Sequence, residues 1–181
     1  MAPLRVCLIG PECTGKTTLA GQLAEHFGVP WVPEFAREYA EREGRLLTAA
    51  DVEPIARGQM ALDDAAPDDE LVILDTDLIS TVVYATHYYD YCPEWIAAEA
   101  RARRADLYLL TDVDVPWTID DVRDSAAPRE ILHRKFATAL ANYGANFVAI
   151  RGDWKTRLRI AITQLNSLRD RPPATTRNPH R

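Results

Sequence analysis

The chain has 181 residues, of which 47% are apolar, values typical of a single globular domain. The formal net charge of -6 argues against non-specific nucleic-acid binding, which needs a basic face. The sequence shows no bilayer-length apolar run and no secretory signal pattern. Cys7, Cys13 and Cys92 form no C-x-x-C pair, so we expect a protein of the reducing cytoplasm, with no membrane partner.

Apolar runs alternate with helical stretches, which indicates an α/β fold around a mainly parallel five-stranded sheet. The expected strands are at 4–9, 30–33, 71–74, 106–110 and 146–150. Prolines at both ends of the second strand favour an edge or strand-end position. After a first helix near 19–27, further helices are expected at 34–43, 51–65 (with Asp51 as its cap), 79–89, 94–104 and 155–168.

Residues 1–168 are expected to form the one domain. The remainder, 169–181, holds three prolines and no large apolar residue, so a disordered tail is expected there. The sequence leaves the oligomeric state open.

The segment Gly10–Thr17, GPECTGKT, fits the phosphate-binding pattern G-x-x-x-x-G-K-[ST] at every fixed position. An apolar run precedes it, and apolar residues at helical spacing follow it. In this context backbone N–H groups and a helix N-terminus surround an anion. Lys16 can reach the β- and γ-phosphates, and the Thr17 hydroxyl can bind Mg²⁺. We expect a nucleoside triphosphate to be bound by Gly10, Glu12, Cys13, Thr14, Gly15, Lys16, Thr17 and Thr18; the motif does not choose between ATP and GTP.

Two carboxylates, Asp75 and Asp77, follow the third expected strand. Asp75 ends a run of four apolar residues, where a carboxylate would hold Mg²⁺ beside Thr17. Asp77 is a candidate general base that takes the proton of the acceptor hydroxyl. The alternative is that Asp77 caps the helix that begins near Ile79.

Glu34 and Arg37 follow the second expected strand. Ligands of open α/β sheets bind at the carboxyl ends of the strands. Glu34 is therefore a candidate for acceptor binding and catalysis, and Arg37 for contacts with acceptor oxygens or a phosphate. An ordinary exposed helix start is the alternative for both residues.

The polar segment 117–134 carries Arg123, Arg129 and Arg134 and is a candidate lid over the triphosphate. Arg123 is our choice for the arginine that neutralises charge on the transferred phosphoryl group; a solvated helical surface is the alternative. Trp117 and Tyr84 are candidates for holding a flat substrate ring, although such aromatic residues more often pack in the core or at its rim.

In this combination and order, the residues resemble the ribosylnicotinamide kinase domain of NadR-type proteins, of the P-loop kinase superfamily. The resemblance covers about 4–168 and rests on four segments: Gly10–Thr17, Glu34 with Arg37, Asp75–Thr81, and the stretch from Trp117 to Arg123. It implies a P-loop kinase fold and transfer of the ATP γ-phosphate to the ribose 5′-hydroxyl of nicotinamide riboside, which gives nicotinamide mononucleotide.

The resemblance also implies individual roles. These are ATP and Mg²⁺ binding by Lys16 and Thr17, metal binding by Asp75, riboside-hydroxyl binding by Asp77 and Glu34, phosphate binding by Arg37 and Arg123, and nicotinamide binding by Trp117.

Two other functions remain open at this point. One is a kinase for another nucleoside or small alcohol, and the other is an ATP-dependent regulatory protein without a small-molecule acceptor. A GTPase switch is disfavoured because Asp75-Thr76-Asp77-Leu78 lacks the glycine of a D-x-x-G motif. Thr111–Asp114 likewise lacks the lysine of the guanine-reading N-K-x-D motif.

Overall fold

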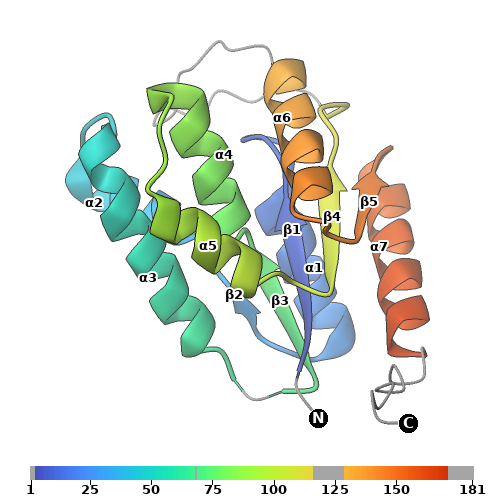
Figure 1. Ribbon diagram of the computed structural model, residues 1–181. Coiled ribbons are helices and arrows are strands. Elements are labelled where there is room, and N and C mark those ends of the chain that lie inside the picture. The colour runs from blue at the N-terminus through green and yellow to red at the C-terminus, as the bar shows by residue number, and fades with distance from the viewer. Residues whose placement is uncertain (1–2, 68, 116–128, 171–181) are drawn as a thin grey trace, which may run out of the picture.

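The computed structural model describes residues 3–67, 69–115 and 129–170. In it, helices cover both faces of a five-stranded sheet (Figure 1). The strands are β1 (Leu4–Ile9), β2 (Trp31–Val32), β3 (Leu71–Asp75), β4 (Leu107–Thr111) and β5 (Phe147–Ile150). The helices are α1 (Lys16–Phe27), α2 (Phe35–Glu43), α3 (Val52–Asp64), α4 (Leu78–Tyr89), α5 (Glu94–Ala102), α6 (Arg129–Asn142) and α7 (Trp154–Arg169), and a 3₁₀ turn, η1, spans Ala49–Asp51.

The strands pair in the order β2-β3-β1-β4-β5, and every pair is parallel. This confirms the expected α/β architecture, and the expectation of a mainly parallel sheet becomes an all-parallel one. The edge position expected for β2 is also confirmed.

Alternate residues of the central strands face two separate cores, as the pleat of a strand requires. One core packs strand residues such as Cys7 and Ile9 against α3, α4, α5 and α6. The other packs their neighbours, such as Val6 and Leu8, against α1 and α7. Because helices cover both faces of β1, β3 and β4, the sequences of these strands are mostly apolar rather than alternating between apolar and polar residues.

The sheet brings the phosphate loop, defined as Gly10–Thr17, next to the end of β3. In the parallel β1–β3 pair Leu8 lies opposite Asp75, so both strands end at the same edge. Thr111 ends β4 at that edge too, and its hydroxyl donates to Ile9 O at 3.2 Å. The carboxyl ends of three neighbouring strands thus meet around the loop, as expected for a ligand site in this fold class.

Two sequence-based interpretations need correction. The polar segment 117–134 is a candidate lid with a solvated helical surface as the alternative, but its last residues begin α6, whose Leu132, Phe136 and Leu140 are buried. Their i, i+4, i+8 spacing was the available signal. Asp51 occupies the N-cap position of α3 as expected, but its side chain closes a capping box with Thr48 around η1 and makes no hydrogen bond to an α3 amide. In the part of the chain that the structure describes, we find no helix with the length and apolarity needed to cross a bilayer.

Candidate nucleotide and acceptor site

The phosphate loop is held in its turn by backbone conformations that favour glycine. Gly10 has φ 142° and Gly15 has φ 84°, both in the region that L side chains rarely adopt. A Cβ on Gly15 would lie 2.4 Å from the indole ring of Trp154. The loop therefore packs directly against the first residue of α7, a contact that the motif alone does not reveal.

Polar side chains of the loop bond to the loop's own backbone. The Lys16 ammonium donates to Pro11 O at 2.7 Å, and the Thr14 hydroxyl donates to the same oxygen at 2.7 Å. Thr14 Oγ1 also lies 2.7 Å from Thr111 Oγ1, at the end of β4. Lys16 is only 7% exposed, so its charge is held close to the concave side of the loop.

Thr17 and Asp75 form the pair expected for a metal. The Thr17 hydroxyl donates to Asp75 Oδ2 at 2.6 Å. The other carboxylate oxygen, Asp75 Oδ1, is buried and has no hydrogen-bond partner among the residues that the structure describes. Burial raises the pKa of Asp75, while the Lys16 charge and the Thr17 hydrogen bond lower it. A buried carboxylate oxygen beside a hydroxyl is the hard-oxygen set that Mg²⁺ takes when phosphates supply further ligands, so these residues fit the ion.

The described residues hold no group of three or more His, Cys, Asp or Glu side chains arranged for a metal. A magnesium site of the phosphate-loop kind needs only one or two protein oxygens. Thr17 and Asp75 are therefore the candidates that the fold offers.

Thr76 turns the chain so that the two neighbouring aspartates point to different places. Its φ of 73° is strained for a β-branched residue, and its N–H donates to Leu8 O at 3.0 Å. Asp77 then caps α4, accepting from Ile79 N at 2.9 Å and from the Tyr108 hydroxyl at 2.6 Å. Burial raises the pKa of Asp77 to about 6 against these hydrogen bonds.

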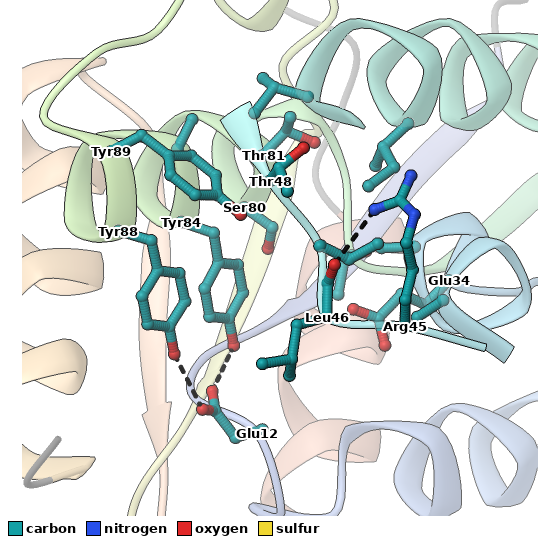
Figure 2. A pocket seen from close by; sticks show the side chains of 17 residues that line it. Glu12, Glu34, Arg45, Leu46, Thr48, Ser80, Thr81, Tyr84, Tyr88 and Tyr89 are labelled. Carbon is teal, nitrogen blue, oxygen red and sulfur yellow. Dashed lines mark hydrogen bonds between the residues drawn. The ribbon is translucent and has the colours of Figure 1, made fainter. Parts of the chain in front are cut away.

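A pocket of about 330 Å³ opens beside the phosphate loop, and Figure 2 shows the side chains that line it. The polar lining includes Glu12 from the loop and Glu34 from the start of α2, and much of the rest is apolar. Among the described residues, Asp77 is not part of this lining. The geometry thus favours the helix-capping interpretation of Asp77, and its general-base role stays a prediction.

Glu34 is placed by contacts that sequence reasoning missed. The residue is 9% exposed and its carboxylate lies 4.0 Å from the Arg37 guanidinium, so this candidate pair does come together. Gln59, from α3, accepts from the Phe35 N–H at 3.0 Å and fixes the start of α2 beside Glu34. A buried polar residue within the apolar face of α3 was the available sequence signal.

Glu12 joins the phosphate loop to the aromatic side of the pocket. Its carboxylate accepts from the Tyr84 hydroxyl at 2.8 Å and from the Tyr88 hydroxyl at 3.4 Å (Figure 2). The two tyrosine rings stack with centroids 6.1 Å apart and planes 6° from parallel. Tyr84 and Glu12 both line the pocket, so Glu12 joins the loop to the pocket, and the substrate role of Tyr84 stays a prediction.

Of the arginines in the 117–134 segment, Arg129 reaches the loop. Its guanidinium donates to Cys13 O at 3.3 Å and to Val115 O at 3.2 Å. Arg123 and Trp117, the residues favoured by the sequence, lie outside the described residues, so their roles stay predictions.

Arg157 is a second arginine that the sequence analysis did not single out. It is 1% exposed and donates to Thr14 O, Asp112 O and Gly152 O at 2.9–3.0 Å, as well as to the Asp114 carboxylate. One buried guanidinium thus links the phosphate loop to the segments after β4 and β5. Its position four residues before Ala161, on the buried face of α7, was the available signal.

The fold and the loop define the class of protein: the chain has the sheet, phosphate loop and strand-end carboxylate of a P-loop kinase. A family model described as an AAA domain matches residues 5–157, and the chain belongs to this family.

Curated relatives make the comparison more specific. The chain is 25% identical over 154 residues to the trifunctional NAD biosynthesis/regulator protein NadR of Salmonella typhimurium LT2. The aligned region covers 81% of this chain and 38% of that protein. For NadR of Escherichia coli K12 the identity is 26% over 153 residues, covering 80% and 37%. The chain therefore spans less than half the length of the relatives it matches.

Solved structures agree with these relatives. A crystal structure of NadR in complex with NR matches 94% of this chain and 52% of its own, with a TM-score of 0.79 and 26% identity. A deoxyadenosine kinase from M. mycoides with bound dATP matches 90% of this chain with a TM-score of 0.58 and 17% identity, which shows a shared fold alone. These findings confirm the resemblance to NadR-type proteins.

Proposed function

We propose that the chain transfers the γ-phosphate of ATP to the ribose 5′-hydroxyl of nicotinamide riboside and so forms nicotinamide mononucleotide. The observation that carries this proposal is the structural match between 94% of the chain and NadR in complex with NR. NR is nicotinamide riboside. The pocket beside the phosphate loop supports it, because Glu12 belongs to the loop and to the pocket lining at once.

The charge of the pocket suits this acceptor. Glu12 and Glu34 line it, whereas the lining guanidinium of Arg45 is engaged by Asp51 at 2.8 Å. A pyridinium ring carries a positive charge, which carboxylates attract and tyrosine faces favour through cation–π contact. Neutral nucleosides would gain only the stacking.

On the nucleotide side, the loop amides and Lys16 bind and orient the β- and γ-phosphates. Thr17 and Asp75 would hold Mg²⁺, which neutralises charge on the phosphates when it is bound. Arg129 lies beside the loop at Cys13 O and is a candidate to reach the transferred group. Arg123 remains the other candidate for this role.

On the acceptor side, Glu34 is better placed than Asp77 to accept the hydroxyl proton, because Glu34 lines the pocket and Asp77 is engaged by Ile79 and Tyr108. Arg37 lies close enough to orient the Glu34 carboxylate. Tyr84 and Tyr88 would pack along the base. In-line transfer between the two sides then needs positioning and charge stabilisation rather than covalent catalysis.

The test is incubation of the purified protein with Mg·ATP and, separately, nicotinamide riboside, purine nucleosides, pyrimidine nucleosides or no acceptor. Mass spectrometry identifies the phosphorylated product. We expect nicotinamide mononucleotide to form well above every other product. Preferential phosphorylation of another nucleoside would replace the acceptor, and ATP binding without any product would favour a regulatory protein.

A further inference from the structure

The segment between α2 and η1 forms one wall of the acceptor pocket, yet it contains an unusually exposed apolar residue. Leu46, Leu47 and Thr48 all line the pocket. Leu46 is 79% exposed, well above the other exposed large apolar side chains of the described chain, such as Tyr91 at 64%. A single exposed leucine is ordinary on a surface, so its meaning depends on how it is held.

The backbone around Leu46 is fixed by one buried carboxylate. Asp51 is 3% exposed and accepts two hydrogen bonds from the Arg45 guanidinium, both at 2.8 Å. It also accepts from Thr48 N at 2.7 Å, from the Thr48 hydroxyl at 3.0 Å and from the Tyr39 hydroxyl at 3.0 Å. Such a charge-assisted, two-pronged pair with additional neutral donors is rigid.

Arg45 extends this network to Leu46 itself. One of its guanidinium nitrogens, Nη1, donates both to Asp51 and to Leu46 O, the latter at 3.0 Å (Figure 2). The carbonyl of the exposed leucine is therefore tied, through one arginine, to the buried carboxylate. These bonds fix the backbone position from which the Leu46 side chain extends.

Leu46 faces the aromatic side of the pocket. Figure 2 shows Leu46 across the pocket from Tyr84 and Tyr88, with Glu34 on its own side. The base of an acceptor is flat and has two faces to bury. Tyr84 offers a surface for one face, and Leu46, one of several apolar residues in the lining, offers a surface for the other.

We propose that Leu46 is a specificity-determining residue of the acceptor pocket, packing on the face of the acceptor's heteroaromatic base opposite Tyr84. Asp51 is the positioning residue that holds Leu46 there through Arg45 and Thr48. The inference rests on the proposed function in that the pocket is taken to bind the acceptor. It adds a residue that the phosphate-transfer machinery does not include.

The experiment is steady-state kinetics of Leu46→Ser, Leu46→Met and Asp51→Asn, each with separate KM values for acceptor and ATP, beside the wild type. Leu46→Ser removes the apolar contact and should raise the acceptor KM about tenfold, within the range expected for losing a buried leucine. Leu46→Met keeps the apolar volume and should stay within about twofold of the wild type. The ATP KM should change less than about twofold in all three, since the nucleotide side is untouched.

Ile131→Ser is the matched control, since Ile131 is another exposed apolar residue, 39% exposed on α6, and does not line the pocket. It should leave both KM values unchanged. Because Leu46 is so exposed, Leu46→Ser is expected to fold normally, and thermal melting checks this.

The positioning role of Asp51 is tested by comparing the single variants Asp51→Asn and Leu46→Ser with the double variant. Asp51→Asn should raise the acceptor KM selectively, and the double variant with Leu46→Ser should be little worse than Leu46→Ser alone, because both changes remove the same contact. A lower melting temperature with no split between acceptor and ATP KM would show that Asp51 acts only on stability. Fully additive effects would equally contradict positioning through Leu46.

The outcomes separate the two proposals. An active wild type with an unchanged acceptor KM in Leu46→Ser overturns the role of Leu46 and leaves the proposed function intact. If the wild type phosphorylates another nucleoside, the nicotinamide riboside proposal fails, and the same variants assayed with that nucleoside decide the role of Leu46. A wild type that phosphorylates no acceptor overturns both.

Discussion

The two sides of the site are built differently. On the nucleotide side, polar side chains bond to backbone oxygens, as Lys16 and Thr14 do at Pro11 O and Arg157 does at Thr14 O. On the acceptor side, the walls are mostly side chains presented by α2, α3, α4 and the segment before η1. The hydrogen bonds on the nucleotide side fix a backbone shape that any triphosphate can use. On the acceptor side, single side chains can be substituted without changing that backbone. Acceptor specificity should therefore be alterable without loss of ATP binding.

The largest expected effect breaks the nucleotide side. Lys16→Ala removes the buried ammonium that neutralises the phosphates, and we expect kcat to fall about a thousandfold or more. Steady-state kinetics measures the loss. Lys135→Ala, which removes an exposed lysine of α6, is the control and should keep nearly full activity. An Lys16→Ala variant with wild-type kcat would remove this loop from the chemistry.

The next effect addresses the acceptor side. Glu34→Gln removes the proposed proton acceptor, and we expect kcat to fall by about 10²- to 10⁴-fold while the ATP KM is nearly constant. Glu38→Gln, an exposed glutamate one turn further along α2, is the matched control and should be active. Asp77→Asn assayed beside it sharpens the comparison. A loss in Asp77→Asn equal to that in Glu34→Gln would return the base role to the end of β3.

The pH dependence of the unfolding free energy tests whether Asp77 is a buried helix cap with a raised pKa. Its folded-state pKa is raised to about 6 from an ordinary value of 3.8, so the folded chain binds this proton more tightly than the unfolded chain does. The resulting stabilisation is complete below about pH 4 and is lost as the pH rises through about 6. Relative to Asp77→Asn, the wild type should therefore lose on the order of 1–3 kcal/mol of unfolding free energy across this window.

Urea unfolding of the two proteins at several pH values between about 4 and 7 measures this difference. Parallel pH profiles for the wild type and Asp77→Asn would show that the Asp77 proton is held no more tightly in the folded chain.

The smallest expected effect concerns charge recognition. Glu12→Gln keeps a partner for the Tyr84 hydroxyl but removes the negative charge, and we expect the KM for nicotinamide riboside to rise about three- to tenfold. The KM for a neutral nucleoside should change less. Tyr88→Phe, which removes only the longer hydrogen bond to Glu12, is the milder control. Equal changes for charged and neutral acceptors would separate Glu12 from charge recognition.

The nucleotide side could be predicted largely from sequence because its residues are contiguous or directly follow an apolar run. The spacing of Gly10, Gly15, Lys16 and Thr17 identified the loop, and the end of β3 identified Asp75. The parallel sheet then brings Asp75 to Thr17, and the observed 2.6 Å contact agrees with that expectation.

The acceptor side could be predicted only in part, because its residues meet through packing between helices distant in the chain. Glu34 and Tyr84 were expected as substrate residues, and both line the pocket. Leu46 also lines the pocket and was not expected there, since an exposed leucine in a polar segment carries no periodic signal. The two possible roles of Asp77 could not be separated either, because they depend on the strained turn at Thr76.

The central claim is that the phosphate loop and the pocket beside it form one site, in which phosphate passes from ATP to the acceptor. The most direct test is to measure ADP release from Mg·ATP with and without nicotinamide riboside. We predict that the riboside stimulates ADP release by about a hundredfold or more, with one nicotinamide mononucleotide formed per ADP. Equal ADP release with and without the riboside, and no nicotinamide mononucleotide, would contradict the account.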